Sequence, residues 1–192
     1  LYSVSGLWRA KQEEWLRPVR WIDNLSLRAS YGIQGNIDKN TSPYLIGTFD
    51  RTTVLPGNIE TVIAAETAPN PNLKWEKTKN VNVGLDMAFL HNRIRLTVDY
   101  YYRRSTDLIS SRQLPLETGF AMTTINWASM ENKGWEFALN TSNISTKNFN
   151  WTTSLNLGVN KNKILNETVA ENATYPAREG YPVGAIFAYR TA

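Results

Sequence analysis

Residues 80–103 read NVNVGLDMAFLHNRIRLTVDYYYR, and this stretch decides the fold. In its first half the odd positions are apolar, and in its second half the even positions are apolar. The apolar residues are Val81, Val83, Leu85, Met87, Phe89, Ile94, Leu96, Val98, Tyr100 and Tyr102. Such strict alternation is typical of strands with one apolar and one polar face. A two-residue turn at His91-Asn92 would set Phe89 opposite Ile94 and Val83 opposite Tyr100, so the stretch predicts an antiparallel hairpin.

The same alternation recurs along the chain, at residues 25–33, 135–139 and 149–159, and more weakly over Tyr2, Val4 and Trp8. About six strands and almost no helix are therefore expected, apart from a short helical turn near residues 12–16. The second hairpin is predicted to have its loop at 144–148, which sets Thr141 opposite Trp151. The fold class is predicted as all-β and antiparallel.

Short and long connections alternate in this pattern. The turns at His91-Asn92 and 144–148 are tight, whereas the segments 36–74, 111–127 and 165 onward are long and rich in Asn, Thr, Gly and Pro. Long structureless loops are unusual in compact soluble domains and are usually functional. Tight turns on one side and long loops on the other are typical of outer-membrane β-barrels.

Strand length and the polar faces favour a transmembrane barrel over a sandwich. The longest runs reach the roughly 9–11 residues that cross a bilayer, whereas sandwich strands usually have about 5–6. Arg93, Arg95, Asp99 and Arg103 share one side of a strand, and an Arg facing lipid costs about 2–4 kcal/mol at the bilayer midplane. These residues are therefore expected to face a hydrated interior. The aromatic residues near strand ends fit interfacial girdles, and they are Trp75, Tyr100, Tyr102, Trp135 and Trp151.

Two alternatives remain open at this point. One is a secreted β-sandwich that acts as a carbohydrate-binding module or adhesin, with the apolar faces packed against a second sheet. The other is an ordinary porin without a plug. If the barrel interpretation holds, about six strands cannot close, since the smallest bacterial outer-membrane barrels have about 8. The chain is then expected to be a fragment of a larger barrel.

Composition argues against enzyme and cofactor chemistry. The chain has 192 residues, no Cys and a single His, which excludes thiolate zinc sites and multi-histidine metal sites. We expect no catalytic residues, metal or cofactor. Asp86 and Asp99 form the one tempting carboxylate pair, at an expected separation of roughly 7–8 Å, and we interpret them as an ion-pair network in which Asp86 reaches Arg95 and Asp99 reaches a nearby Arg. The net charge of +4 is scattered, so no nucleic-acid partner is expected.

Several motifs resemble those of SusC/RagA-type TonB-linked outer-membrane transporters, and they follow the family's order over nearly the whole chain. They are LSLRASYG at 25–32, NPNLKWEKT at 70–78, NVGLD at 82–86, VDYY at 98–101, TDLI at 106–109, TGF at 118–120, ENKGWE at 131–136, NFNW at 148–151, NKNKI at 160–164 and GYPVG at 180–184. One departure is Trp127-Ala128, where the family usually has an aliphatic residue and Gly.

The resemblance implies a large plugged barrel of about 22 strands, of which residues 1–192 would be an incomplete C-terminal part without the plug and TonB box. Its implied partners are a SusD-like surface lipoprotein, outer-membrane lipid, a glycan or peptide substrate, and TonB through regions absent from this chain. The implied location is the outer membrane of a Gram-negative bacterium, and the implied activity is uptake of glycan oligomers or peptides.

Aromatic residues in the long segments are the candidate contacts for substrate or for the lipoprotein. Sugars are bound by aromatic faces, and the candidates are Tyr44, Phe49, Phe120, Trp127 and Tyr181. Packing of the loops on themselves is at least as good an explanation for each of these side chains.

Overall fold

The computed structural model describes residues 1–39, 41–65, 67–167 and 178–188. The chain divides into two compact units, which are treated separately below. Unit 1 comprises Leu1–Gln34, Thr78–Arg104 and Glu131–Lys163, and unit 2 comprises Gly35–Lys77, Ser105–Met130 and Ile164–Ala192. Residues 168–177 of the third long segment lie outside the described residues.

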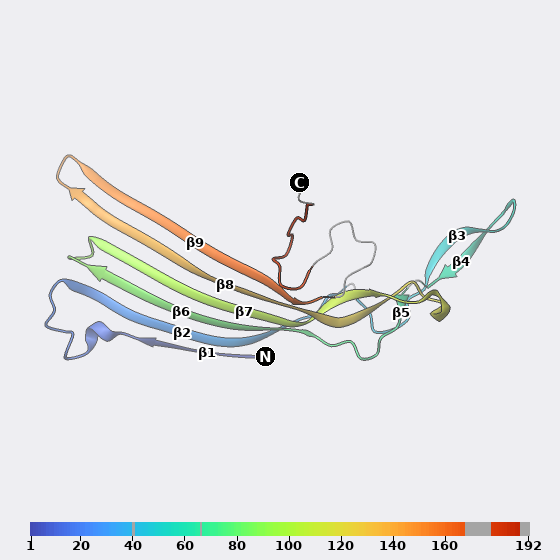
Figure 1. Cartoon of the computed structure of the whole chain (residues 1–192). Coiled ribbons are helices and arrows are strands. Elements are labelled where there is room, and N and C mark those ends of the chain that lie inside the picture. The colour runs from blue at the N-terminus through green and yellow to red at the C-terminus, as the bar shows by residue number, and fades with distance from the viewer. Residues whose placement is uncertain (40, 66, 168–177, 189–192) are drawn as a thin grey trace. The chain divides into compact units, whose positions relative to one another are not determined.

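The described residues are almost entirely β-structure, which confirms the predicted fold class (Figure 1). The strands are β1 (Tyr2–Trp8), β2 (Ile22–Asn36), β3 (Thr48–Leu55), β4 (Asn58–Ala64), β5 (Thr67–Ala68), β6 (Glu76–Phe89), β7 (Ile94–Gln113), β8 (Met122–Ser145) and β9 (Asn150–Asn166), and the 3-10 turns are η1 (Ala10–Gln12) and η2 (Leu116–Thr118). None of the described helical segments is long and apolar enough to cross a membrane.

The long strands pair in the order β1, β2, β6, β7, β8 and β9, while β5 runs parallel to β8 and β3 pairs with β4 alone. The β1–β2 register sets Tyr2 opposite Ile33, Val4 opposite Tyr31 and Trp8 opposite Leu27, so apolar residues meet apolar residues. In the described sheet β1 and β9 each pair on one side only. The described sheet is thus open at both edges.

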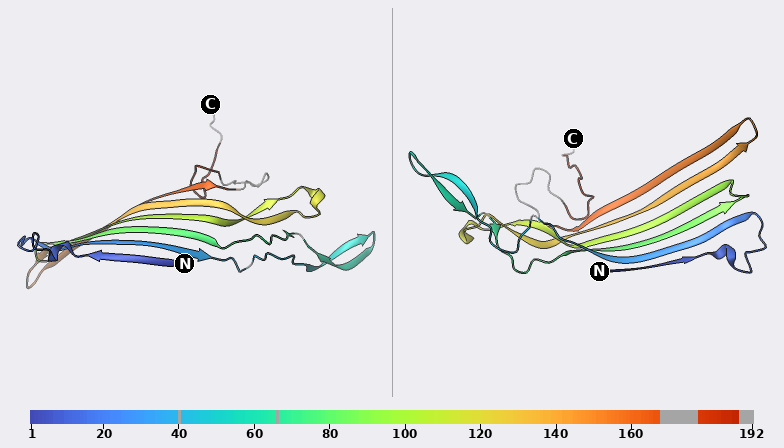
Figure 2. Two further views of the ribbon diagram at one scale, coloured as in Figure 1. Left: turned by 90° about the horizontal axis from the view of Figure 1, so that it is seen from below. Right: turned by 180° about the vertical axis from the view of Figure 1, so that it is seen from behind.

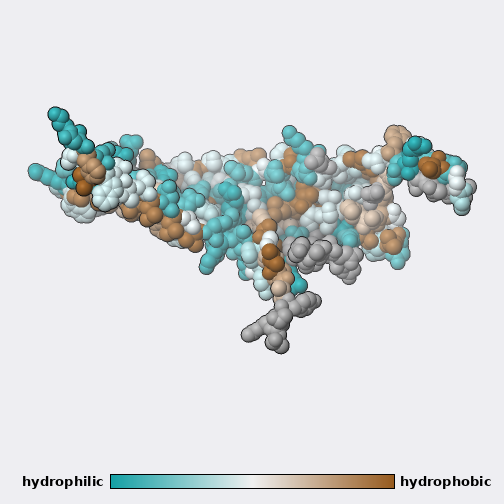
Figure 3. Space-filling view, turned by 90° about the horizontal axis from the view of Figure 1, so that it is seen from above, coloured by the Kyte–Doolittle hydropathy of each residue, from teal (hydrophilic) through white to brown (hydrophobic). Residues whose placement is uncertain are grey.

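Unit 1 is a single layer of strands without a core of its own (Figures 1 and 2). Its buried apolar residues are Ala88 on β6 and a small cluster of Ala10, Leu16 and Ile22 around the β1–β2 connection. Large apolar side chains such as Trp135, Trp151, Leu155 and Leu157 are exposed, and brown apolar residues lie at the surface in Figure 3. The β-sandwich alternative needs a second sheet over this apolar face, and no described segment of unit 1 provides one.

The β6–β7 turn has the predicted geometry. The Leu90 carbonyl accepts a hydrogen bond from the Arg93 N–H at 3.3 Å, and the two central residues, His91 and Asn92, have φ of 59° and 60°. Positive φ at both central positions defines a type I′ turn, whose twist matches that of the flanking strands. The Asn92 N–H also donates to Asp23 Oδ2 at 2.8 Å.

The β8–β9 turn is shorter than predicted, because the strands continue to Ser145 and resume at Asn150. The connection is 146–149, closed by the Thr146 N–H donating to the Phe149 carbonyl at 2.8 Å. The side chains of Asn143 and Thr153 bond at 2.7 Å, which the predicted register would place too far apart. The predicted register was therefore wrong by an even number of residues, a shift that keeps each residue on its predicted face.

Unit 2 contains strands where loops were expected. The hairpin of β3 and β4 lies inside the predicted loop 36–74, and Pro56-Gly57, with φ of 84° at Gly57, forms its turn. The predicted loop 111–127 is also too long, since β7 extends to Gln113 and β8 begins at Met122. The actual connection, residues 114–121, contains η2, which is followed by Gly119, whose φ of 76° favours glycine.

Candidate functional site

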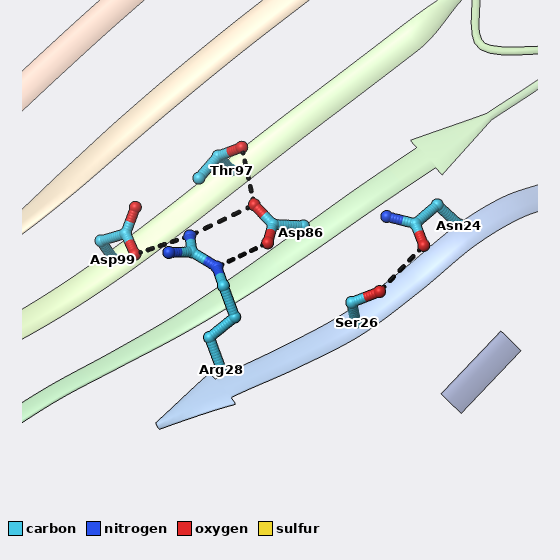
Figure 4. A network of polar contacts seen from close by, with 6 residues as sticks. All are labelled: Asn24, Ser26, Arg28, Asp86, Thr97 and Asp99. Atoms are coloured by element: carbon cyan, nitrogen blue, oxygen red, sulfur yellow. Dashed lines mark hydrogen bonds and ion pairs between the residues drawn. The ribbon is translucent and has the colours of Figure 1, made fainter. Parts of the chain in front are cut away.

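The polar face of unit 1 carries an ion-pair network across three strands (Figure 4). Arg28 on β2 donates from Nε to Asp86 Oδ2 at 2.6 Å and from Nη2 to Asp99 Oδ1 at 3.0 Å. Thr97 on β7 donates its hydroxyl to Asp86 Oδ1 at 3.2 Å. One guanidinium thus joins the carboxylates of β6 and β7 to β2, and its planar fork suits this bridging role.

The partners in this network differ from those expected. Asp86 was predicted to reach Arg95, and instead it pairs with Arg28, while the nearby Arg expected for Asp99 is also Arg28. The signal for Arg28 was present, because it lies at a polar position of the alternating run 25–33. It was missed because β2 and β6 are separated by a long connection, and adjacency of their strands does not follow from the alternation.

A polar groove adjoins the network within unit 1. It has a volume of about 580 Å³ and is lined by Arg28, Ser30, Asn80, Asn82, Asp99, Tyr100, Tyr101, Tyr102, Arg103, Asn132 and Glu136. Arg103 Nε donates to Asn80 Oδ1 at 2.9 Å, and Asn82 Nδ2 donates to Ser30 Oγ at 3.3 Å. The amide oxygen of Asn132 is buried without a hydrogen-bond partner among the described residues. Charged and amide side chains of this kind fit a hydrated surface better than a packed core.

All five candidate aromatic residues lie in unit 2, and Tyr44, Phe49 and Tyr181 are among its exposed side chains. Tyr44 is 77% exposed and lines a pocket of about 240 Å³ together with Thr41, Ser42 and Thr124. Phe49 is 81% exposed on β3, opposite the exposed Ile63. Tyr181 packs edge-on against Phe187, with ring centroids 4.9 Å apart. These side chains are accessible to a ligand.

The other two candidates are placed differently. Phe120 is half-buried in the β7–β8 connection, where its N–H donates to Thr118 Oγ1 at 3.4 Å. Trp127 was expected in a loop and instead lies within β8, exposed, with its carbonyl accepting from Asn166 Nδ2 at 3.4 Å. No hydrogen bond or ring stacking among the described residues joins any two of the five candidates.

Comparison with known proteins places the fold in a family. The sequence profile described as "TonB dependent receptor-like, beta-barrel" matches residues 2–187. The chain belongs to this TonB-dependent receptor family. The family is one of outer-membrane receptors and transporters rather than a class of enzymes.

Curated relatives include a TonB-dependent receptor of Formosa agariphila, 38% identical over 85% of this chain. Another is the TonB-dependent receptor SusC of Bacteroides thetaiotaomicron, 36% identical over 93% of this chain. The chain spans 16% of the first relative and 18% of the second. It therefore corresponds to less than a fifth of a TonB-dependent receptor of this kind.

Solved structures show the same arrangement of strands. The RagAB peptide importer in its closed-closed state superposes with a TM-score of 0.77 and 28% identity, over 94% of this chain and 20% of that chain. Its open-open state gives a TM-score of 0.78 at the same identity and coverage. The TonB-dependent receptor barrel thus accounts for the open, single-layered sheet of unit 1.

Proposed function

We propose that this chain forms part of the barrel of a TonB-dependent transporter in the outer membrane of a Gram-negative bacterium. The observation that carries the proposal is the two-sided character of unit 1: one face exposes Trp135, Trp151 and Leu155, and the other bears the Arg28 network. A single layer with these faces suits hydrocarbon on one side and a hydrated interior on the other. Over β7 the apolar run from Ile94 to Tyr102 covers about 9 residues, enough to cross a bilayer when tilted.

We place the chain in the C-terminal part of a plugged barrel of about 22 strands. Closure is required because an unpaired strand edge in hydrocarbon costs several kcal/mol for each free backbone group. The edges of β1 and β9 would then pair with strands from other parts of the full protein, which would also supply the plug and the TonB box. Energy for transport would reach this region through those parts.

The transported substrate in this proposal is a glycan oligomer or a peptide, captured with a SusD-like surface lipoprotein. Support comes from the relative SusC and from the RagAB structures, which are described as those of a peptide importer. The candidate contacts to substrate or lipoprotein are Tyr44, Phe49, Phe120, Trp127 and Tyr181, and the exposed rings of Tyr44 and Phe49 suit such contacts best. Aromatic rings with neighbouring hydroxyl groups, as around Tyr44, can bind either sugars or peptide side chains.

Deletion of the full-length gene in the source bacterium tests this proposal. Cells would be grown on a panel of purified glycan oligomers and on a peptide mixture as sole carbon source, and the full-length protein would be located by fractionation. We expect outer-membrane location, loss of growth on one member of the panel, and co-purification of a lipoprotein. Recovery of the full-length protein as a stable soluble monomer without detergent would overturn the proposal.

A further inference from the structure

Five cations lie on the apolar side of unit 1, at one end of its apolar face. We call them the basic row, and they are Lys79 on β6, Arg104 on β7, Lys133 on β8, and Lys161 and Lys163 on β9. All five side chains are exposed. On this face they lie just beyond Tyr100, Tyr102 and Trp135, at the end that is remote from the tight turns.

Contacts between neighbouring strands show which residues lie on this face. Asp86 bonds Thr97, and Asn80 bonds Arg103, so even residues of β6 and odd residues of β7 share the polar face. Lys79 and Arg104 therefore lie on the opposite, apolar side.

The same argument extends to β8 and β9. The rings of Tyr100 and Trp135 are 4.8 Å apart, which places odd residues of β8, including Lys133, on the apolar side. The bond between Asn143 and Thr153 joins odd residues of β8 to odd residues of β9, so Lys161 and Lys163 lie there as well.

The positive charges of the basic row are largely unbalanced. The Asp86–Thr97 and Asn80–Arg103 contacts fit a single register, in which Lys79 lies directly opposite Arg104. Like charges opposite each other on one face destabilise a sheet. Glu131 is the one carboxylate at an apolar-side position of these strands within unit 1, where it pairs with Lys133 at 3.6 Å and accepts from the Tyr102 hydroxyl at 3.3 Å. The Arg93–Ser142 and Tyr100–Trp135 contacts fit one register, which sets Glu131 opposite Arg104 as well, so a single carboxylate faces two of the five cations. Among the described residues the other four cations form no ion pair.

We propose that the basic row binds the phosphate groups of lipid molecules surrounding the barrel. The inference rests on the membrane placement proposed above. The row continues the apolar face without a break, so a ligand that contacts both needs acyl chains as well as an anionic headgroup. Aromatic side chains lie at headgroup level in membrane proteins, and Tyr100, Tyr102 and Trp135 place the row at that level. Lys and Arg near an anionic lipid surface are attracted to it, and a phosphate between Lys79 and Arg104 would remove their repulsion.

The test uses the full-length protein reconstituted into phosphatidylcholine vesicles that contain either diphosphorylated lipid A or the same lipid with its phosphates removed. The protein is then extracted, and the lipid A molecules retained per protein are counted by native mass spectrometry. The variant carries Lys79→Gln, Arg104→Gln, Lys133→Gln, Lys161→Gln and Lys163→Gln. The matched control changes five other exposed cations, Lys39→Gln, Arg51→Gln, Arg95→Gln, Arg112→Gln and Lys147→Gln, and so alters the net charge equally.

We expect the wild type and the control to retain diphosphorylated lipid A in preference to the dephosphorylated form, and the variant to retain about tenfold less. Retention should also fall as salt rises, because the interaction is between charges. Equal retention by variant and control, or equal retention of the two lipids by the wild type, would overturn the inference. If the wild type inserts into vesicles but shows no such preference, the lipid inference is wrong and the proposed transporter function is not affected. Failure to insert into either kind of vesicle would contradict the proposed transporter function.

Discussion

The exposed apolar side chains of the two units differ in their order. In unit 1 they alternate with polar residues along β6, β7, β8 and β9, and they share one face of a sheet. In unit 2 the exposed residues Tyr44 and Ile46 lie in irregular segments and Leu116 lies in η2, while Phe49 and Ile63 lie opposite each other on the separate β3–β4 hairpin. Unit 2 is instead connected by polar side chains that bond to backbone groups, such as Asn70 to the Thr124 carbonyl at 2.8 Å. The comparison teaches that the order of unit 1 comes from a sheet with one apolar and one polar face, whereas the order of unit 2 comes from individual hydrogen bonds.

The largest expected effect on stability comes from a charge placed on the apolar face of β9, compared with the same charge on its polar face. Leu155→Arg introduces a guanidinium on the apolar face, and Asn156→Arg introduces the same group on the polar face one residue away. The first should lower the free energy of unfolding by about 2–4 kcal/mol in lipid vesicles, since Arg is costly near the bilayer midplane. The second should change it by less than about 0.5 kcal/mol. Urea titration of the full-length protein in vesicles measures both, and equal losses would show that the apolar face of unit 1 does not contact lipid.

The next largest expected effect comes from removing the side-chain amide of Asn126, and the loss of stability should be confined to unit 2. Its Oδ1 accepts from the Lys74 N–H at 2.6 Å, and its Nδ2 donates to the carbonyls of Lys74 at 2.8 Å and Asp107 at 2.7 Å. Asn126→Ala leaves these backbone groups unpaired and should weaken the local structure by about 1–3 kcal/mol. Hydrogen exchange of the full-length protein should then accelerate around Lys74 and remain unchanged at β6–β7 of unit 1.

Asn126→Asp serves as the matched substitution, because it keeps the acceptor and loses the donor. Its exchange rates should fall between those of the wild type and of Asn126→Ala. Unchanged exchange at Lys74 in both variants would mean that unit 2 does not depend on these bonds, and the contrast between the units would then be wrong.

The sequence predicted unit 1 far better than unit 2, for a physical reason. Alternation specifies which face a residue occupies, and the type I′ turn at His91-Asn92 then fixes the β6–β7 pairing. It does not specify which distant strand lies alongside, which is why Arg28 was missed as the partner of Asp86. Nor does it fix the β8–β9 register when a shift of two residues keeps every apolar side chain on its face.

In unit 2 the signals were shorter and weaker. The Pro56-Gly57 turn of the β3–β4 hairpin could have been found, since such dipeptides mark turns. The bonds of Asn126 could not, because an amide that joins Lys74 to Asp107 leaves no periodic trace in the sequence. Trp127 was placed in a loop because the polar composition of 111–127 hid the beginning of β8.

Breaking the Arg28 network should lower the free energy of unfolding by a smaller amount, because its members are partly exposed. Side-chain exposures of 45% for Arg28, 30% for Asp86 and 35% for Asp99 allow water to screen the charges. Arg28→Gln should lower the free energy of unfolding by about 1 kcal/mol, since two carboxylates lose their shared cation. In Arg28→Gln/Asp99→Asn the loss should be smaller than the sum of the two single losses. Urea titration in vesicles measures this, and strict additivity would show that the ion pair contributes nothing to unit 1.

The exposed ring of Phe49 provides the smallest effect on stability and the most direct test of a ligand-contacting role for unit 2. Because the side chain is 81% exposed, Phe49→Ala should change the free energy of unfolding by less than about 0.5 kcal/mol. A role in substrate or lipoprotein contact would nevertheless reduce growth on the oligomer that the gene-deletion experiment identifies. Ile63→Ala is the matched control, since Ile63 lies opposite Phe49 and is also exposed but is not an aromatic candidate. Equal growth of cells carrying Phe49→Ala, Ile63→Ala or the wild type would remove Phe49 from the candidate contacts. The ring would then neither stabilise the hairpin nor contact a ligand during uptake.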